Sequence, residues 1–198
     1  MLLRLYTDFV CPFCFIAEES TVPRLVRELG LELEWHGFEL HPRTPPGGLP
    51  LSRLFPGRDL ASMHEGTRRF AAEFGVTNFS PPNTLYNTRR ALAVAEYARD
   101  SEKLLAFKRA AFDANFRHGK NLESDADLRE IAASVGLDPE RALEASRDPL
   151  YLGRVDERQA EARHEGISGI PTFLIGKERV VGCQPYEVLL AAAKRALG

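Results

Sequence analysis

Two cysteines separated by two residues are the side chains of this sequence best suited to chemistry. They lie in the motif Cys11-Pro12-Phe13-Cys14, which follows the strand-like apolar run Leu2–Tyr6 and precedes a long amphipathic stretch. A sulfur at a helix start faces unpaired backbone N–H groups and the positive end of the helix dipole, which favour the nucleophilic thiolate. Pro12 suits the first helical position, where the amide hydrogen that proline lacks would have no partner. The motif therefore predicts thiol–disulfide exchange.

The cysteine pair has two other interpretations. A C-x-x-C motif is half of a structural zinc site, but Cys183 is the one other cysteine and the five histidines show no paired ligand spacing. Two buried structural cysteines would leave the intervening proline unexplained. Redox chemistry accounts for the whole motif and predicts that no metal is bound.

Length, charge and hydrophobicity narrow the functional class. The 198 residues suffice for one sizeable core, and 44% hydrophobic and 27% charged residues are ordinary for a globular protein. A net charge of -2 provides no footprint for nucleic acid, and no apolar run approaches the ~20 residues that cross a bilayer. Because the motif begins at residue 11, no room remains for a secretory signal peptide. We therefore expect a cytoplasmic protein without nucleic-acid or membrane partners, in whose reducing compartment a cysteine pair is typically catalytic.

The elements around the motif predict a β-α-β unit. Residues 15–30 place apolar side chains at mostly helical spacing, with Pro23 expected to kink or restart the helix and Gly30 to end it. Residues 31–38 then alternate apolar and polar side chains, as in a half-buried strand. Residues 41–56 are rich in proline and glycine and predict a loop that leaves the sheet.

The middle of the chain predicts helices almost exclusively. Strand signals nearly vanish between residues 58 and 164, while apolar periodicity and capping residues indicate successive helices. The expected helices are Leu60–Phe74, Thr88–Tyr97, Leu104–Phe116, one opening at Ser124, a short one starting at Asp138-Pro139, and Tyr151–Arg163.

The tail returns to strand signals. Residues 171–175 and 179–181 flank a turn at Gly176-Lys177 and predict a β-hairpin, and Tyr186–Leu197 predicts a final helix. Without the middle block, the order is β-α-β followed by α-β-β-α, which is the order of the thioredoxin fold. We therefore expect an α/β thioredoxin fold, formed by residues 1–56 and 152–198, that an all-helical insertion at 57–151 interrupts.

Motifs that are far apart in the sequence point to one known family. The two most specific are the Cys11–Cys14 motif and Gly169-Ile170-Pro171-Thr172-Phe173, which opens the late hairpin. Further segments are Trp35–Pro42, Asn87-Thr88 followed by Ala91, Gly136–Asp138 and Gly182–Pro185. Together they resemble the DsbA family of thioredoxin-fold dithiol oxidoreductases, and most closely its cytoplasmic FrnE-like branch.

The resemblance implies a role for the residues of the two main motifs. Cys11 would be the more exposed, attacking thiolate, and Cys14 the buried resolving thiol one turn further along the helix. Pro171 would be a cis proline beside them, leaving the backbone of Ile170 free to bind an extended substrate. Phe13 stands where a histidine could help to stabilise the thiolate. We therefore expect a couple less oxidising than the periplasmic oxidants near about -120 mV, closer to a reductase or isomerase.

Four residues outside the two motifs have two interpretations each. Asp8, three residues before Cys11, could relay a proton to or from the resolving thiol, or it could fix the strand-to-helix turn. His41 could face a substrate groove, although a solvent-facing loop histidine is the simpler expectation. Asn87 and Thr88 most simply cap a helix, and the resemblance adds the alternative that they line the active-site cleft.

Cys183 is the odd thiol of the chain. A small buried cysteine is the usual case. In thioredoxin folds, however, its turn lies beside the cis proline, and the related branch commonly carries alanine there. We hypothesise that Cys183 can trap Cys11 in an alternative disulfide or become glutathionylated.

Three functions follow from these residues. The leading prediction is an enzyme that exchanges thiols and disulfides in cytoplasmic proteins and peptides, with no tightly bound cofactor and with glutathione or another low-molecular-weight thiol as co-substrate. The runner-up is a glutathione-dependent transferase or isomerase, because kappa-class transferases and hydroxychromene-carboxylate isomerases share the inserted fold. Those relatives typically have serine in place of Cys11 and lack the second cysteine. The presence of both Cys11 and Cys14 therefore favours the oxidoreductase over the transferase or isomerase. A third alternative is a peptide-binding, chaperone-like module whose activity would survive Cys11→Ala.

Overall fold

A four-stranded mixed sheet with the strand order β2-β1-β5-β6 forms the centre of the thioredoxin-like part of the molecule. The computed structural model describes residues 1–197, so Gly198, the end of the predicted core segment 152–198, lies outside the described residues. β1 (Leu2–Thr7) pairs in parallel with β2 (Glu32–Gly37) and antiparallel with β5 (Thr172–Ile175), which pairs antiparallel with β6 (Glu178–Val181). The predicted β-α-β unit and late hairpin are thus confirmed.

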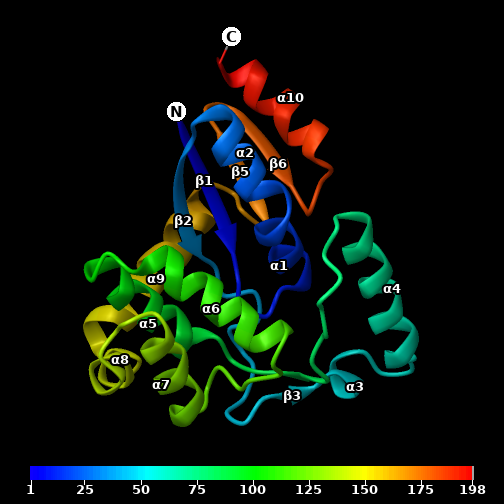
Figure 1. Cartoon of the computed structure of the whole chain (residues 1–198). Helices are drawn as coiled ribbons and strands as arrows, with labels where there is room; N and C mark the ends of the chain where they lie inside the picture. Colours follow the sequence, from blue (N-terminus) through cyan, green and yellow to red (C-terminus); the bar gives the residue numbers. More distant parts are fainter. Residues whose placement is uncertain (198) are drawn as a thin grey trace.

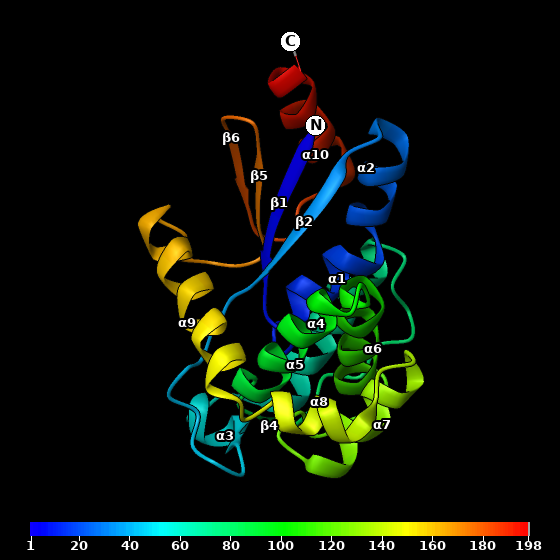
Figure 2. The ribbon, with the colours of Figure 1, turned by 90° about the vertical axis from the view of Figure 1, so that its left-hand side faces the viewer.

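The two faces of the sheet are covered by different helices because successive strand residues point to opposite sides. Leu3, Leu5 and Phe173 belong to the main core, which also contains residues of α1 (Pro12–Glu19), α2 (Thr21–Leu29) and α10 (Tyr186–Leu197). Tyr6 and Leu174 join a second cluster with Ala162 of α9 (Pro149–His164). α9 accordingly lies beside the sheet on the side away from α2 (Figure 2).

The helix after the cysteine motif breaks earlier than predicted. It ends at Ser20 (φ -120°, ψ -78°), whose hydroxyl donates to the Ile16 carbonyl at 2.5 Å, and a new helix begins at Thr21. Pro23 lies in the first turn of α2, where its missing amide hydrogen costs little. Gly30, at φ +60°, ends α2 as predicted, in the left-handed conformation that glycine adopts readily.

The predicted helical block forms, with small shifts in its bounds. It contains α5 (Arg89–Asp100), α6 (Leu104–Phe116), α7 (Asp125–Ser134) and α8 (Pro139–Ala145). α9 begins at Pro149 rather than Tyr151 because the Asp148 side chain caps it and accepts from the Leu150 N–H at 2.8 Å. The predicted boundary near residue 151 therefore falls inside a helix, and the division into domains stays a prediction.

The segment between residues 41 and 85 departs most from the prediction of a plain loop followed by a helix. It contains β3 (Leu49–Pro50), α3 (Leu51–Leu54), α4 (Leu60–Glu73) and β4 (Thr84–Leu85). β3 and β4 pair antiparallel, so the two ends of the segment 51–83 lie next to each other. We call these residues the arm. Figure 1 shows its helix α4 beside α1, set apart from the block of α5–α8.

Candidate active site

The cysteine motif lies where β1 ends and α1 begins, in a turn held by several hydrogen bonds. Cys11 is the N-cap of α1, and its sulfur accepts the backbone N–H of Cys14 at 3.2 Å. The Cys11 amide donates to the Asp8 carbonyl at 3.0 Å. Asn115 of α6 donates to the Phe9 carbonyl at 2.9 Å, which joins the turn to the helical block. The turn therefore aims the Cys11 sulfur at the amino end of α1.

Cys11 is more enclosed than expected, whereas Cys14 is buried as expected. Cys11 has 2% of its surface exposed and Cys14 has none, so Cys11 is the more exposed of the two by a small margin, but it does not lie open to solvent. Burial raises the pKa of Cys14 well above its usual value, and interaction with Cys11 adds to the shift. Cys14 is therefore protonated in the resting dithiol.

The late motif lies against Cys11. The Ile170–Pro171 bond is cis, as the resemblance implies, and the Ile170 carbonyl oxygen lies 3.9 Å from the Cys11 sulfur. The Gly182 amide donates to the Pro171 carbonyl at 2.7 Å, which places the turn before Cys183 beside this proline. Cys183 is buried, and burial followed by the charge of Cys11 raises its pKa to about 12.

Asp8 is fully buried beneath the motif. Burial raises its pKa from 3.8 to about 7, and the Leu40 amide, the Thr88 side chain and the Val10 amide oppose the shift only in part. One carboxyl oxygen accepts the Leu40 N–H at 2.7 Å, whereas the other makes no hydrogen bond with residues 1–197. The charge of Asp8 also contributes to the raised pKa of Cys14. A carboxyl group that titrates near neutral pH therefore lies within electrostatic range of the buried thiol.

A cavity of about 650 Å³ opens beside Cys11 and is walled on its far side by the arm. We call it the arm cavity. Its lining includes His41, which is half-buried rather than fully solvent-facing, and a role for this histidine in a substrate groove stays a prediction. Burial lowers the pKa of His41. Phe13 is 42% exposed and meets Phe70 of α4 edge to face, with ring centroids 5.3 Å apart.

Asn87 and Thr88 divide the roles expected of them. The Asn87 carboxamide accepts the Arg89 amide at 2.9 Å and donates to the Thr44 carbonyl at 3.0 Å, so this side chain binds the first amide of α5, whose N-cap residue is Thr88. Thr88 is buried and acts on Asp8. Neither residue lines the arm cavity. The structure thus joins Thr88 to the site through Asp8 and leaves Asn87 outside it.

Several site residues escaped the sequence analysis. The arm supplies Leu54, Met63, His64, Phe70 and Pro82 to the cavity wall. The one available signal was the pattern of α4, whose apolar residues recur at helical spacing. That pattern predicts that one face of the helix is buried, but it does not indicate which segment covers that face. Asn115 carries no signal at all, because its bond to Phe9 joins residues far apart in the chain.

Residues 1–197 offer neither a cluster of metal ligands nor a membrane-spanning helix. Within residues 1–197, no group of three or more histidine, cysteine, aspartate or glutamate side chains is placed to hold a metal ion. No helix among these residues combines the length and apolarity needed to cross a bilayer.

The fold and the site together define a class: a thioredoxin-like fold with a helical insertion and a C-x-x-C pair at the start of its first helix. The DSBA-like thioredoxin domain matches residues 3–194. The chain belongs to this family.

Two curated relatives match most of the chain. YwbO, an uncharacterized protein of Bacillus subtilis, is 26% identical over 190 residues, which cover 94% of this chain and 92% of that protein. The 2-hydroxychromene-2-carboxylate isomerase of Sphingobium xenophagum is 25% identical over 171 residues, or 86% of each chain. The relatives of this family thus include an isomerase.

Two solved structures share the fold. A probable DsbA oxidoreductase from Streptomyces coelicolor aligns with a TM-score of 0.87 and 24% identity, over 100% of this chain and 90% of that one. The cytosolic disulfide reductase DsbM from Pseudomonas aeruginosa, solved with GSH, aligns with a TM-score of 0.67 and 17% identity, over 99% and 95%. At these identities the two likenesses concern the fold.

Proposed function

We propose that this protein is a thiol–disulfide oxidoreductase that acts on protein or peptide disulfides, with Cys11 as nucleophile and Cys14 as resolving thiol. The observation that carries the proposal is the Cys11 sulfur at the start of α1, where it accepts the Cys14 amide at 3.2 Å. A negative sulfur is stabilised by that amide and by the helix dipole. The partly open cavity beside it gives a substrate access.

The chemistry proceeds in two displacements. The Cys11 thiolate attacks one sulfur of a substrate disulfide, forms a mixed disulfide and releases the other sulfur as a thiolate. Cys14 then loses its proton and attacks the Cys11 sulfur, which releases the second substrate thiol and leaves a Cys11–Cys14 disulfide. Two electrons pass from the protein to the substrate. Two equivalents of another thiol restore the dithiol and leave as a disulfide, and glutathione is our candidate because the DsbM structure contains it.

Asp8 is the proposed proton acceptor for Cys14. The raised Cys14 pKa makes its deprotonation the costly step, and a buried carboxylate with a pKa of about 7 can take up that proton near neutral pH. The Leu40 amide positions the carboxyl group, Thr88 lowers its pKa, and Ile170 and Pro171 border the nucleophile. Asp8 therefore acts as a proton relay in addition to its place in the turn.

The reducing or isomerising direction follows from Phe13. This side chain cannot donate a hydrogen bond to the thiolate, so the dithiol is stabilised less than in strong oxidants. The same direction suits a cytoplasmic protein of the FrnE-like branch, and DsbM, a cytosolic reductase by name, supports that location. A reduction potential well below about -120 mV is expected.

Insulin reduction with glutathione or a dithiol donor, paired with a redox titration of Cys11 and Cys14, tests the proposal. Wild-type protein should accelerate insulin precipitation, and the titration should report one two-electron couple. A potential as high as that of the periplasmic oxidants would contradict the direction. No acceleration with either donor would contradict the exchange itself.

The second candidate is a glutathione-dependent isomerase, favoured by the hydroxychromene-carboxylate isomerase relative. An isomerase of that kind would use only the residue at position 11 and would not need Cys14 as a resolving thiol. Cys14→Ser separates the two functions. Full retention of cellular activity by this variant would support the isomerase, whereas loss of turnover with accumulation of a mixed disulfide supports the dithiol cycle.

A further inference from the structure

Among residues 1–197, no aspartate, glutamate, lysine or arginine side chain lines the arm cavity. Such residues make up 27% of the chain, so their absence from this wall is a marked departure from the rest of the molecule. The wall is formed instead by aromatic, aliphatic and proline side chains, with a few hydroxyl groups and two histidines. Its large apolar side chains include Phe13, Leu54, Phe55, Met63, Phe70 and Phe116.

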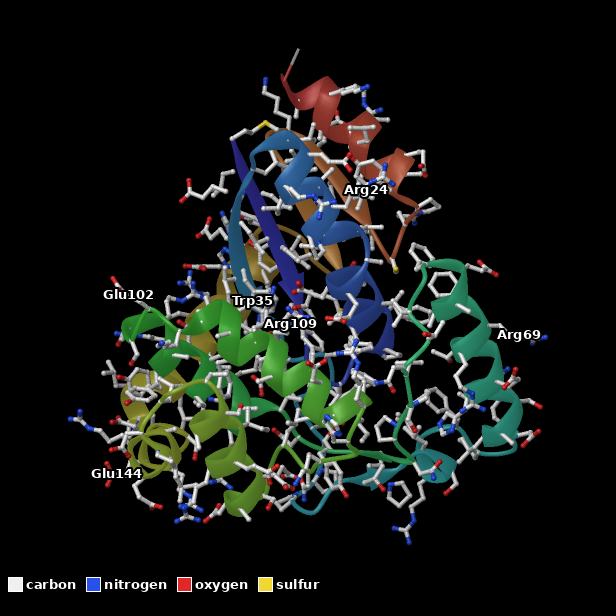
Figure 3. All side chains as sticks on the ribbon, in the orientation of Figure 1. Arg24, Trp35, Arg69, Glu102, Arg109 and Glu144 are labelled. Carbon is white, nitrogen blue, oxygen red and sulfur yellow. The ribbon has the colours of Figure 1, made fainter. Side chains whose placement is uncertain are left out.

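The arm helix shows that this composition is not a general property of its segment. α4 carries Glu65, Arg68 and Arg69 on its exposed side, and Figure 3 shows Arg69 pointing away from the molecule. The same helix turns Met63, Thr67 and Phe70 toward the cavity. α4 is therefore amphipathic, and its apolar face borders the space beside Cys11.

The two histidines leave the wall uncharged at neutral pH. Burial lowers the pKa of His41, and burial together with the nearby Arg68 lowers the pKa of His64. Both imidazoles are consequently neutral at pH 7. A charged ligand that enters the cavity would lose water without gaining a partner of opposite charge, which is costly.

The volume suits a small molecule. A cavity of about 650 Å³ lies within the range of pockets that enclose small ligands, which is roughly 300 to 1,000 Å³. Cys11 is 2% exposed, so its sulfur is reached through this space rather than across an open surface. Phe13 and Phe70 present ring faces and edges at its border, an arrangement that binds aromatic groups well.

We propose that the arm cavity binds the uncharged aromatic group of a low-molecular-weight disulfide and holds it beside Cys11 for reduction. This inference rests on the proposed exchange chemistry and adds the class of substrate. The Cys11 thiolate displaces one aromatic thiolate from the disulfide, and Cys14 displaces the second, leaving the protein disulfide. One molecule of reduced protein thus supplies both electrons. Glutathione, whose carboxylates find no cation in this wall, serves as reductant without filling the cavity.

Single-turnover kinetics with two aromatic disulfides test the inference. Reduced, desalted protein is mixed at neutral pH with dipyridyl disulfide, which is uncharged, or with dithiobis(nitrobenzoate), which carries two carboxylates. Both release a coloured thiol. Each rate is divided by the rate of the same reagent with free mercaptoethanol, which corrects for the leaving group. The corrected ratio of the uncharged to the charged reagent should be at least about tenfold.

Two lysine variants locate the effect in the cavity. Thr67 lines the wall, and its hydroxyl contacts the Met63 carbonyl of its own helix, so Thr67→Lys adds a cation while removing one local bond. This variant should accelerate the charged reagent and lower the corrected ratio roughly tenfold. Ala72→Lys, on the exposed side of α4, is the matched control and should leave the ratio within about twofold.

The outcomes separate the two proposals. A corrected wild-type ratio near unity overturns the cavity inference, and so does an equal response to both lysines. Because the wild-type ratio is measured first, the decision does not depend on the folding of a variant. If neither reagent releases thiol faster from the protein than from mercaptoethanol, the exchange chemistry itself is wrong.

Discussion

Two buried carboxyl groups, Glu39 and Asp8, show how differently the molecule treats charge in neighbouring regions. Glu39 is 5% exposed and accepts a hydrogen bond from Arg89 at 2.9 Å, and Arg89 also binds Asp156 of α9 at 2.8 Å. Asp8 is fully buried, and no cation pairs with it among residues 1–197. An ion pair is useful for joining elements, whereas a titratable group without a partner is free to exchange a proton. The charges of Glu39, Arg89 and Asp156 thus join α5 to α9. In the mechanism proposed above, the Asp8 carboxyl group instead serves proton transfer beneath the cysteines.

The largest expected effect comes from removing the nucleophile. Cys11→Ser should lower insulin reduction at least about a thousandfold, because the hydroxyl does not ionise near neutral pH and cannot attack a disulfide. Cys14→Ser should retain the first displacement and accumulate a mixed disulfide at Cys11. Intact-mass measurement of each variant after incubation with substrate checks both results. Residual turnover by Cys11→Ser would break the comparison, because the region of Asp8 and the two cysteines would then not be the reactive one.

The next effect concerns Asp8 as a proton acceptor. Asp8→Asn should slow the release of the second thiol by roughly a hundredfold at neutral pH, because Cys14 loses its proton acceptor. In the wild type this step should accelerate as pH rises through about 7, where Asp8 ionises. Stopped-flow measurement of thiol release across this range checks the profile. A wild-type rate independent of pH would assign Asp8 to the turn alone.

Asp8 also makes a prediction about stability. Folding raises its pKa from 3.8 to about 7, so its stabilising contribution is fully present below pH 3.8 and is lost as pH rises through 7. Between pH 5 and pH 8, the wild type should lose roughly 2 to 3 kcal/mol of unfolding free energy relative to Asp8→Asn, which stays neutral. Urea unfolding of the reduced proteins measures the difference. A constant difference would mean that Asp8 is not buried as described.

Arg89 sharpens the other side of the comparison. Arg89→Ala leaves Glu39 buried without its cation and should lower the free energy of unfolding by about 2 kcal/mol. Arg69→Ala, an exposed arginine of α4, is the control and should change stability by less than about 0.5 kcal/mol. The single-turnover rate of folded Arg89→Ala should match the wild type, because Arg89 acts on assembly. A selective loss of rate would show that the two regions are coupled.

The smallest expected effect belongs to Cys183. Cys183→Ser should leave the exchange rate within about twofold, since the raised pKa of about 12 keeps this thiol protonated during turnover. Under oxidation, a minor fraction should carry a Cys11–Cys183 disulfide or a glutathione adduct at Cys183, and Cys14→Ser should increase it. Mass mapping of the oxidised sample measures that fraction. Cys183 remaining wholly free would end the idea of a third redox thiol.

The parts of the fold that sequence could predict depend on local pattern. Alternation over residues 31–38, capping before α7 and the Gly176 turn each act within a few neighbours, and each element formed. The cysteine motif belongs to this group, because its chemistry follows from one strand end and one helix start. The cis bond before Pro171 was expected through the family likeness alone, since most X–Pro bonds are trans.

The parts that sequence could not predict depend on contacts between distant segments. The edge-to-face contact of Phe13 with Phe70 and the placement of Thr88 beside Asp8 carry no local signal. Cys11 is enclosed next to Ile170, and His41 borders the cavity whose far wall is the arm, a segment predicted as loop and helix with no indication of where it would pack. β3 and β4 are two residues each, too short for a periodic pattern.

The pairing of Leu49 with Leu85 and of Pro50 with Thr84 brings both ends of the arm to one point. Such a closed excursion can lengthen, shorten or change sequence while the chain on either side keeps its path, because its ends remain together. The arm therefore meets the geometric condition for replacement by a segment of another length or sequence. Replacing this one segment would change the wall of the arm cavity and leave the cysteines, Asp8 and the sheet unaltered.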